Sequence, residues 1–387
     1  MKKIRFLTAG ESHGPALTVI LEGIPAGLPL TKEEIDLDLF RRQQGFGRGG
    51  RMAIEKDEVE ILSGLRRGFT LGTPVGLLVR NRDWENWKEV MAVEPGGSET
   101  KPVTTPRPGH ADLSGALKFG FQDIRNVIER ASARETAARV AAAAIVKKLL
   151  FVFGISIYSR VVQIGTVCDH SEFHPPEGCD VIENSRLRCL SSVAEAKMVD
   201  LINQARENGD TLGGIFEVKA TGLPVGLGTY TQWDIRLDGL LAQALMSIPG
   251  VKGVEVGEGF RLASLFGSKA HDEIFHESKK GFYRKTNRAG GLEAGVTNGQ
   301  PLVIRAAMKP ISTLGQPLTT VDIISRKPAT AIKERSDVCA VPAAGIVGEA
   351  MTAFVLADAF LEKFGGDSIE EIKKNKDLKH LDADFRR

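Results

Sequence analysis

Arginine and histidine side chains suited to binding and protonating an anion are concentrated in residues 105–136, TPRPGHADLSGALKFGFQDIRNVIERASARET. The segment begins as a loop in which two prolines and a glycine surround Arg107 and His110. Such a loop is too rigid and polar for a core, but it can present side chains. A helical pattern follows, runs toward an alanine-rich stretch and carries Arg125, Arg130, Ser132 and Arg134. Guanidinium groups bind phosphate and carboxylate, so the segment predicts an anion site beside a proton donor.

A second histidine, His13, lies in residues 10–15 (GESHGP), directly after the β-rich residues 4–9. Functional side chains are often presented at the end of a strand. A solvated turn histidine would give the same pattern, and the sequence leaves both interpretations open.

A glycine-rich basic loop follows the first predicted helix. Thr31 and Glu34 have the spacing of a capping box, so this helix begins at Thr31, and it ends near Gln44. The loop of residues 45–51 (GFGRGGR) follows a helix, whereas a dinucleotide fingerprint follows a strand. A solvated loop, an RNA contact and a lid over a small multiply charged anion all remain open. We favour the lid, because the cluster is short and Phe46 is its one aromatic residue. The arginines in and beside this loop are Arg41, Arg42, Arg48 and Arg51.

The overall composition is typical of a soluble globular protein. The 387 residues are 42% hydrophobic and 26% charged, and the net charge of +2 argues against a nucleic-acid or membrane partner. The chain contains no run of 18 apolar residues and no secretory signal at its N-terminus. Four cysteines in a chain of this length indicate a reducing cytosol.

The cysteines and histidines of residues 168–179 match no standard zinc-finger spacing, so we predict no metal site there.

Alternating and helical patterns predict the elements that position these residues. We expect strands at 17–21, 59–65, 74–80, 155–165 and 301–309, and helices continuing to Phe153, at 195–208, at 231–247 and from Pro342. Residues 81–99, which contain Trp84 and Trp87, are polar and are interpreted as a surface excursion.

The second half of the chain repeats cues of the first half in the same order. Three matches in sequence make a duplicated unit the better interpretation. The pairs are residues 23–28 with 222–227, residues 70–75 with 297–302, and residues 129–131 with 334–336. We predict one α+β domain over residues 1–387, with pseudo-repeats at about 4–154 and 210–365 and a polar insertion at about 166–208. In this β-α-β sandwich, helices pack between two antiparallel sheets. A site between the halves would bring residues 130–134 and 335–337 together.

Polar side chains also mark two turns of the second half. Residues 309–313 (KPIST) offer an ammonium group and two hydroxyls suited to a phosphate, although ordinary turn residues would look the same. An isolated Arg-x-Asp is usually a local ion pair. Residues 335–337 (RSD) are a better candidate for a functional site, because they match the arginine segment of the first half.

Taken together, these motifs resemble the chorismate synthase family over residues 4 to about 365. The matching segments are residues 10–15, residues 42–51, residues 107–112 (RPGHAD), Glu129 with residues 132–136 (SARET), and residues 335–337. The echo between the halves also agrees with the fold of that family.

The resemblance implies the last step of the shikimate pathway. The expected reaction is a 1,4-anti elimination of phosphate from 5-enolpyruvylshikimate 3-phosphate, which gives chorismate and requires reduced FMN without net redox change. A cytoplasmic homotetramer is expected. The chain shows no added reductase domain, so reduced FMN would come from a separate flavin reductase. The resemblance leaves open whether NADPH binds near Arg42 and Arg48. The alternatives are an enzyme that uses no flavin and an RNA-binding module acting through residues 41–51.

The resemblance also implies roles for individual residues. His13 would protonate the departing phosphate, His110 would protonate or hydrogen-bond the flavin, and Asp337 would assist proton removal through flavin N5. The implied substrate-binding residues are Ser12, Arg42, Arg48, Arg51, Arg107, Arg134 and Arg335. The implied FMN-binding residues are Ala131, Ser132, Ala133, Gly250, Ala294, Lys309, Pro310, Ile311, Ser312, Thr313 and Arg335. Ala294 stands where the family often has glycine.

Overall fold

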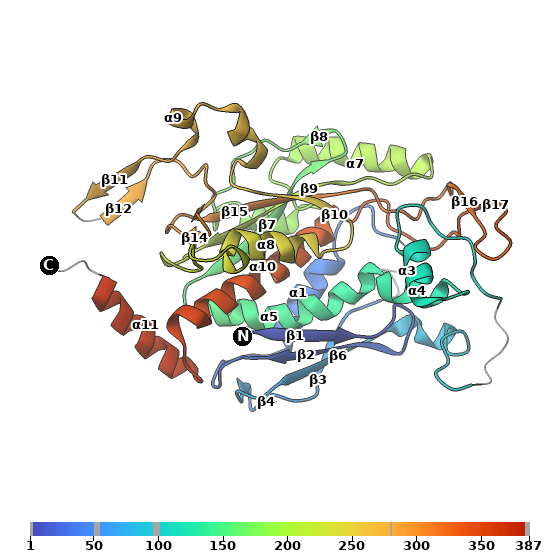
Figure 1. The fold of residues 1–387 in the computed structure, drawn as a ribbon, viewed down its shortest axis with the longest axis horizontal. Coiled ribbons are helices and arrows are strands. Elements are labelled where there is room, and N and C mark those ends of the chain that lie inside the picture. The colour runs from blue at the N-terminus through green and yellow to red at the C-terminus, as the bar shows by residue number, and fades with distance from the viewer. Residues whose placement is uncertain (1–2, 50–54, 96–100, 279–280, 384–387) are drawn as a thin grey trace.

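Two antiparallel sheets enclose a layer of helices in the computed structural model, which describes residues 3–49, 55–95, 101–278 and 281–383 (Figure 1). The first sheet has the order β1-β2-β6-β3, with β1 Arg5–Ala9, β2 Ala16–Glu22, β6 Val75–Arg80 and β3 Val59–Ile61. The second has the order β10-β15-β9-β7-β8, with β10 Val251–Val256, β15 Leu302–Met308, β9 Gly214–Thr221, β7 Ser156–Ile164 and β8 Val167–Cys168. The predicted α+β sandwich is therefore confirmed.

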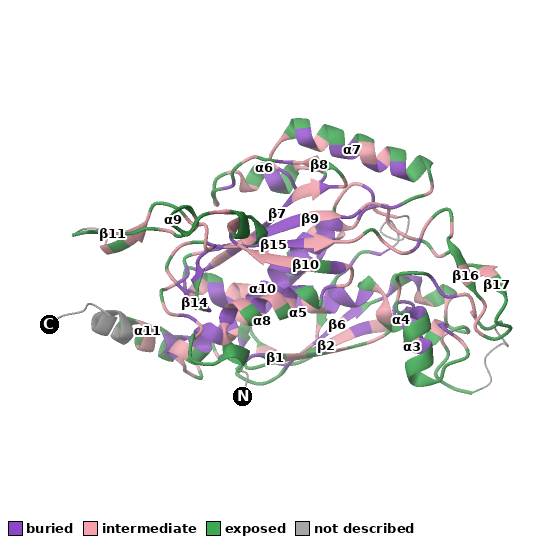
Figure 2. Cartoon of the chain, turned by 45° about the horizontal axis from the view of Figure 1, so that its top comes forward, coloured by how far each residue is buried: buried purple, intermediate pink, exposed green. Residues whose placement is uncertain are grey.

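Four helices fill the space between the sheets: α1 Lys32–Gln43, α5 Thr136–Val152, α8 Leu237–Met246 and α10 Val341–Phe364 (Figure 1). The alanine run of α5 is almost entirely buried, because small side chains allow close packing on both sides (Figure 2). On α10, a Cβ at Gly348 would lie 2.5 Å from the ring of Phe216 on β9, so glycine permits this close approach. α10 is long and apolar enough to cross a membrane, but 89% of its most apolar window is buried inside the protein. It is the central core helix.

The capping box of α1 is present as predicted. The Thr31 side chain accepts a hydrogen bond from the Glu34 amide, and the Glu34 carboxylate accepts one from the Thr31 amide at 2.9 Å. Both orphan amides at the helix start are thereby satisfied.

The two sheets share one topology. Strands β7, β9, β15 and β10 occupy, in order, the positions of β1, β2, β6 and β3. The turns that begin at Gly23 and Gly222 follow equivalent strands and precede α1 and α8. This equivalence supports the duplicated unit that the sequence echo indicates.

A buried threonine fixes the same turn in each half. The Thr70 hydroxyl donates to the Pro25 carbonyl at 2.6 Å and accepts from the Leu28 amide at 2.9 Å. The Thr297 hydroxyl donates to the Pro224 carbonyl at 2.7 Å and accepts from the Leu227 amide at 2.8 Å. Both side chains come from short hairpins, β4–β5 (Leu65–Arg66, Phe69–Thr70) and β13–β14 (Leu292–Glu293, Val296–Thr297).

We expect Thr297→Val and Thr70→Val each to lower the free energy of unfolding by about 1–3 kcal/mol, because valine leaves a buried amide and a buried carbonyl unsatisfied. Urea denaturation followed by far-UV circular dichroism measures the change. Thr166→Val, at an exposed turn, is the control. Equal stability of all three variants would contradict the structural role of these hydroxyls.

One predicted helix is broken into several. The segment that was expected to run as one helix to Phe153 forms α3 Asp112–Phe119, α4 Arg125–Ala131, the 3₁₀ helix η2 Ala133–Glu135, and α5. Ser132 is extended (φ −65°, ψ 140°), and its hydroxyl accepts from the Arg134 amide. A serine side chain that bonds its own backbone competes with the helix. The break places residues 132–134 before the start of α5 and outside its regular helix.

The remaining elements lie around this core. The predicted helix at 231–247 begins late, as η3 Trp233–Ile235 followed by α8. In the insertion of residues 166–208, the structure describes no group of three or more His, Cys, Asp or Glu side chains arranged for a metal ion. The other elements are η1 Arg82–Asn86, α6 Cys179–Asn184, α7 Ser192–Glu207, η4 Gly259–Ser264, α9 Gly267–Ala270, β11 Ile274–Glu277, β12 Gly281–Arg284, β16 Thr319–Val321, β17 Pro328–Thr330 and α11 Ile369–Ala383.

Candidate active site

A cavity of about 630 Å³ lies between the two halves. Its walls include residues 131–134 from the first half and residues 334–337 from the second, so the predicted meeting of the two arginine segments is confirmed. Arg130 is the exception, because its guanidinium binds the carbonyls of Thr8 and Gly10. The cationic side chains in the wall are Arg42, Arg48, Arg107, Arg134, Lys252, Lys309 and Arg335.

His13 is buried at the end of β1 and is held by Glu129 of α4. The Glu129 carboxylate lies 3.0 Å from His13 Nδ1 and also accepts from the His13 amide at 2.8 Å. With Nδ1 occupied, Nε2 is the ring nitrogen left for a ligand. The structure therefore supports a functional histidine over the solvated turn histidine.

Glu129 stays ionised despite its burial. Burial raises the pKa of its carboxyl, but hydrogen bonds and charge from His13, with Arg125, outweigh that effect and lower the pKa overall. Arg125 also binds Glu334 at 2.8 Å, while its other nitrogen contacts Glu129 at 3.2 Å. One guanidinium thus joins the two segments that the sequence echo pairs.

His110 is held in the loop that precedes α3 by the fully buried Asp112. Its Nδ1 lies 2.5 Å from the Asp112 carboxylate, which also binds the Arg107 guanidinium at 2.9 Å. Burial raises the pKa of Asp112, but the bonds from His110 and Arg107 hold it well below its usual range. Arg107 reaches the second half by donating to the Thr313 hydroxyl at 2.8 Å.

Arg42 and Arg134 share a single buried carboxylate. Asp57 contacts Arg134 Nη1 at 2.5 Å and Arg42 Nη1 at 3.2 Å. Burial, together with the neighbouring arginines, lowers the pKa of Arg42 to about 10 although Asp57 opposes the shift, so Arg42 remains cationic at neutral pH. Arg42 also donates to the Thr136 hydroxyl and Arg134 to the Asn81 side chain, so both guanidinium groups are held in place where they line the cavity.

Arg48 and Asp337 bring the glycine-rich loop to the second half. The Asp337 carboxylate accepts from the Gly49 amide at 2.6 Å and contacts Arg48 Nε at 3.2 Å. A Cβ at Gly49 would lie 2.6 Å from the Ser336 carbonyl, so this approach requires glycine. The described part of the loop therefore forms a wall of the cavity, as the lid interpretation predicts.

Arg41 turns away from the cavity into an internal ion network. It contacts the fully buried Glu349 at 2.9 Å, Glu183 at 2.7 Å and Asp38 at 2.8 Å. The guanidinium groups of Arg41 and Arg42 thus form ion pairs with carboxylates of the same chain. They do not form an exposed basic surface for RNA.

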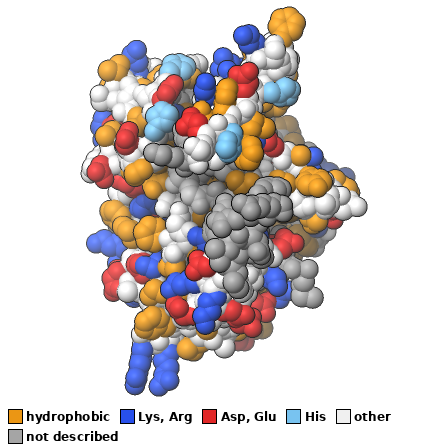
Figure 3. Space-filling model, turned by 90° about the vertical axis from the view of Figure 1, so that its left-hand side faces the viewer, with side chains coloured by type: hydrophobic (Ala, Val, Ile, Leu, Met, Phe, Trp, Pro, Cys, Tyr) orange, Lys and Arg blue, Asp and Glu red, His pale blue; other side chains and the backbone are white. Residues whose placement is uncertain are grey.

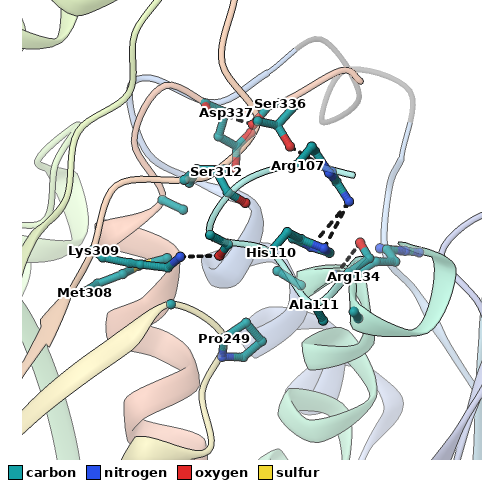
Figure 4. A pocket seen from close by; sticks show the side chains of 18 of the residues that line it. Arg107, His110, Ala111, Arg134, Pro249, Met308, Lys309, Ser312, Ser336 and Asp337 are labelled. Carbon is teal, nitrogen blue, oxygen red and sulfur yellow. Dashed lines mark hydrogen bonds between the residues drawn. The ribbon is translucent and has the colours of Figure 1, made fainter. Parts of the chain in front are cut away.

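The second half supplies Lys309 and Arg335. Lys309 donates to the Gly109 carbonyl and so ties residues 309–313 to the His110 loop (Figure 4). Arg335 binds the buried Asp83 at 2.5 Å. Asp83 lies in η1, within the segment that was interpreted as a surface excursion. That interpretation is wrong for this part of it, because the following Trp87 stacks on the ring of His13.

The sequence and the structure of this chain are similar to those of known proteins. The chorismate synthase family model matches residues 4–361. Curated chorismate synthases of Sulfurihydrogenibium sp. and Aquifex aeolicus are each 56% identical, with 96% and 97% of this chain and 97% and 96% of the relatives covered. A solved crystal structure of chorismate synthase is 46% identical, with a TM-score of 0.79 and 98% of each chain covered.

The chain belongs to the chorismate synthase family. It is accordingly a carbon–oxygen lyase, which eliminates phosphate from 5-enolpyruvylshikimate 3-phosphate to give chorismate, the last step of the shikimate pathway. The RNA-binding alternative finds no support in these relatives.

Most residues predicted from the resemblance to chorismate synthases line this one cavity. They are Ser12, His13, Arg42, Arg48, Arg107, His110, Ala131, Ser132, Ala133, Arg134, Gly250, Lys309, Pro310, Ile311, Ser312, Thr313, Arg335 and Asp337. Ala294 is not among the described lining residues and lies instead in the turn between β13 and β14. Arg51 falls outside the described residues. The roles predicted for all of these residues remain to be tested.

Sequence reasoning missed several groups that complete the site. Asp57, Asp83 and Trp87 contact the predicted residues directly, yet they lie in polar stretches without a periodic pattern. Glu129 and Asp112 belong to motifs that match the family, but no role was predicted for them from the sequence. Each is an acidic residue a few positions from a candidate arginine or histidine, and this short spacing could have identified both.

Proposed function

We propose that this cavity binds 5-enolpyruvylshikimate 3-phosphate beside reduced FMN and that His13 is the acid that protonates the departing phosphate. The observation that carries the proposal is the His13–Glu129 pair at the edge of a cavity lined by five arginines and two lysines. Glu129 holds Nδ1 of the His13 ring. The Nε2 proton is then the one available to a phosphate oxygen.

The cationic wall suits this substrate, which carries a phosphate and two carboxylates. Arg42 and Arg134 are fixed by Asp57, and Arg107 is fixed by Asp112, so their guanidinium groups are oriented before a ligand arrives. Preorganised donors stabilise charge that develops on a leaving group without reorganisation during the reaction.

The residues around the cavity also suit FMN. Residues 309–313 offer the Lys309 ammonium and hydroxyls for a phosphate, while small residues 131–133 leave room for a ring system. When bound, reduced FMN would supply electron density that weakens the C–O bond of the substrate. His110 would hydrogen-bond the flavin, and Asp337 would assist removal of the substrate proton. Asp112 and the Gly49 amide hold these two groups in place.

An anaerobic assay with substrate and photoreduced FMN tests this proposal. Phosphate, chorismate and the flavin spectrum are followed together. We expect phosphate and chorismate in equal amounts, no lasting oxidation of the flavin, and no turnover without it. Phosphate release in the absence of any flavin would favour the flavin-independent alternative.

We further propose a homotetramer in the cytoplasm that receives reduced flavin from a separate reductase. Hydrophobic and histidine side chains gather on the face around α9 and the β11–β12 hairpin (Figure 3). The side chains of Phe260, Phe266 and Phe282 are each more than 70% exposed, which is unusual unless a partner covers them.

Arg42 and Arg48 face the substrate cavity, so NADPH bound there would compete with substrate. Sedimentation analysis and an NADPH competition assay test these points.

A further inference from the structure

Trp87 is the aromatic partner of His13. The two rings stack with centroids 3.9 Å apart and planes inclined by 21°. His13 lines the large cavity, whereas Trp87 lines a separate hollow of about 360 Å³ beside it. The two stacked rings thus line different cavities.

Trp87 is itself held by a carboxylate that also binds the second half. Burial raises the pKa of Asp83, but hydrogen bonds from Asn86, Arg335 and Trp87 lower it overall, so Asp83 is ionised and accepts from all three. The Asp83–Arg335 contact is 2.5 Å. One carboxylate thus fixes both the indole behind His13 and an arginine in the cavity wall.

Arg125 contacts the same cluster. Its guanidinium carbon lies 5.2 Å from the centre of the Trp87 ring, and its nitrogens bind Glu129 and Glu334. The His13 imidazole is therefore bounded by Glu129 at Nδ1 and by Trp87 on a ring face. Trp87 and Glu129 are both anchored through charged groups to residues 334–335 of the other half.

We propose that Trp87 is a positioning residue that fixes the ring plane of His13, so that Nε2 faces the leaving phosphate. The ring is tethered at Cγ and held by Glu129 at Nδ1, so the motion left to it is a tilt of the ring plane. A stacked indole opposes that tilt. This inference rests on the acid role proposed for His13. The His13–Trp87 contact can be tested independently of that role.

Fluorescence tests the contact without turnover. The chain has three tryptophans, so Trp84→Phe with Trp233→Phe leaves Trp87 as the sole indole. A protonated imidazole in contact quenches indole emission. We expect an acid-dependent fall in emission that disappears when His13→Gln is added. The difference spectrum between the wild-type protein and Trp87→Phe gives the same information if the double variant folds poorly. Emission that is unaffected by His13→Gln would overturn the inference.

Anaerobic steady-state kinetics test the positioning role. We expect Trp87→Ala to lower kcat by about 10- to 100-fold, the scale of a misplaced catalytic group. KM should change by less than about threefold, and Trp87→Phe should restore most of kcat, because a phenyl ring still stacks. Trp84→Ala, in the same segment, is the matched control and should retain kcat. A Trp87→Ala variant that folds and keeps wild-type kcat refutes the positioning role.

The two proposals fail in different ways. If His13 quenches Trp87 but His13→Ala retains turnover, the contact stands and the acid role of His13 is wrong. If His13→Ala abolishes turnover while Trp87→Ala does not change it, the acid role stands and the positioning role is wrong.

Discussion

Replacing His13 with alanine should lower kcat by about 10²- to 10⁴-fold, which is the usual contribution of a general acid. His13 is buried at the cavity edge, and Glu129 fixes its Nδ1 at 3.0 Å. Without the imidazole, the phosphate must leave as a more basic anion or take its proton from water. Anaerobic single-turnover kinetics with photoreduced FMN measure the chemical step apart from flavin supply.

Two variants show whether the effect belongs to the proton. Glu129→Gln keeps the size of the side chain but replaces the carboxylate that holds His13 Nδ1 by an amide, so its kcat should fall by a smaller factor. His174→Ala is the matched histidine control, because that side chain is 71% exposed and lies in the insertion. Turnover of His13→Ala close to the wild-type value would rule out the acid role.

Replacing Asp57 with asparagine should have the largest effect on stability. The carboxylate contacts both Arg134 and Arg42, and all three side chains are buried. Removing one partner from a buried ion cluster leaves charge uncompensated and typically costs about 3–5 kcal/mol. We expect the lower end of that range, because Glu55 also lies 3.7 Å from Arg134. Urea unfolding measures the loss.

The same variant should respond more strongly to anions. With Asp57 neutralised, Arg42 lacks its carboxylate and Arg134 keeps only the more distant Glu55, so added substrate or inorganic phosphate should recover more stability than in the wild-type protein. Glu60→Gln removes an exposed partner of Arg80 and is the control, with nearly unchanged stability expected. An Asp57→Asn protein as stable as the control would show that the shared carboxylate does not neutralise the site.

The repeated architecture could be predicted because its cues are local. Glycine turns, the Thr31–Glu34 capping box and the order of strands are encoded over a few residues, and the same order occurs twice. The break at Ser132 was missed for a related reason. The alanine-rich pattern favours a continuous helix, whereas the Ser132 side chain bonds the Arg134 amide and ends it locally.

The partners of the charged residues could not be predicted in the same way. Arg335 binds Asp83 across 252 positions of the chain, and His13 binds Glu129 across 116. Residues 81–87 look like a polar surface loop in the sequence, because the partners that bury them, such as Arg335 and His13, come from distant segments. The packing of the two halves brings Asp83 to Arg335, and the folding of the first half brings Trp87 to His13.

The sequence by itself determined the chemical groups of this chorismate synthase family member, the duplicated order of its elements and the segments that carry its cations. Those features depend on residue type and short spacing. The tertiary structure decided which carboxylate neutralises each arginine, which nitrogen of His13 is held, and which ring stacks on it. The physical reason is burial: desolvated charges require close partners, and those partners come from whichever segments the sandwich packs together.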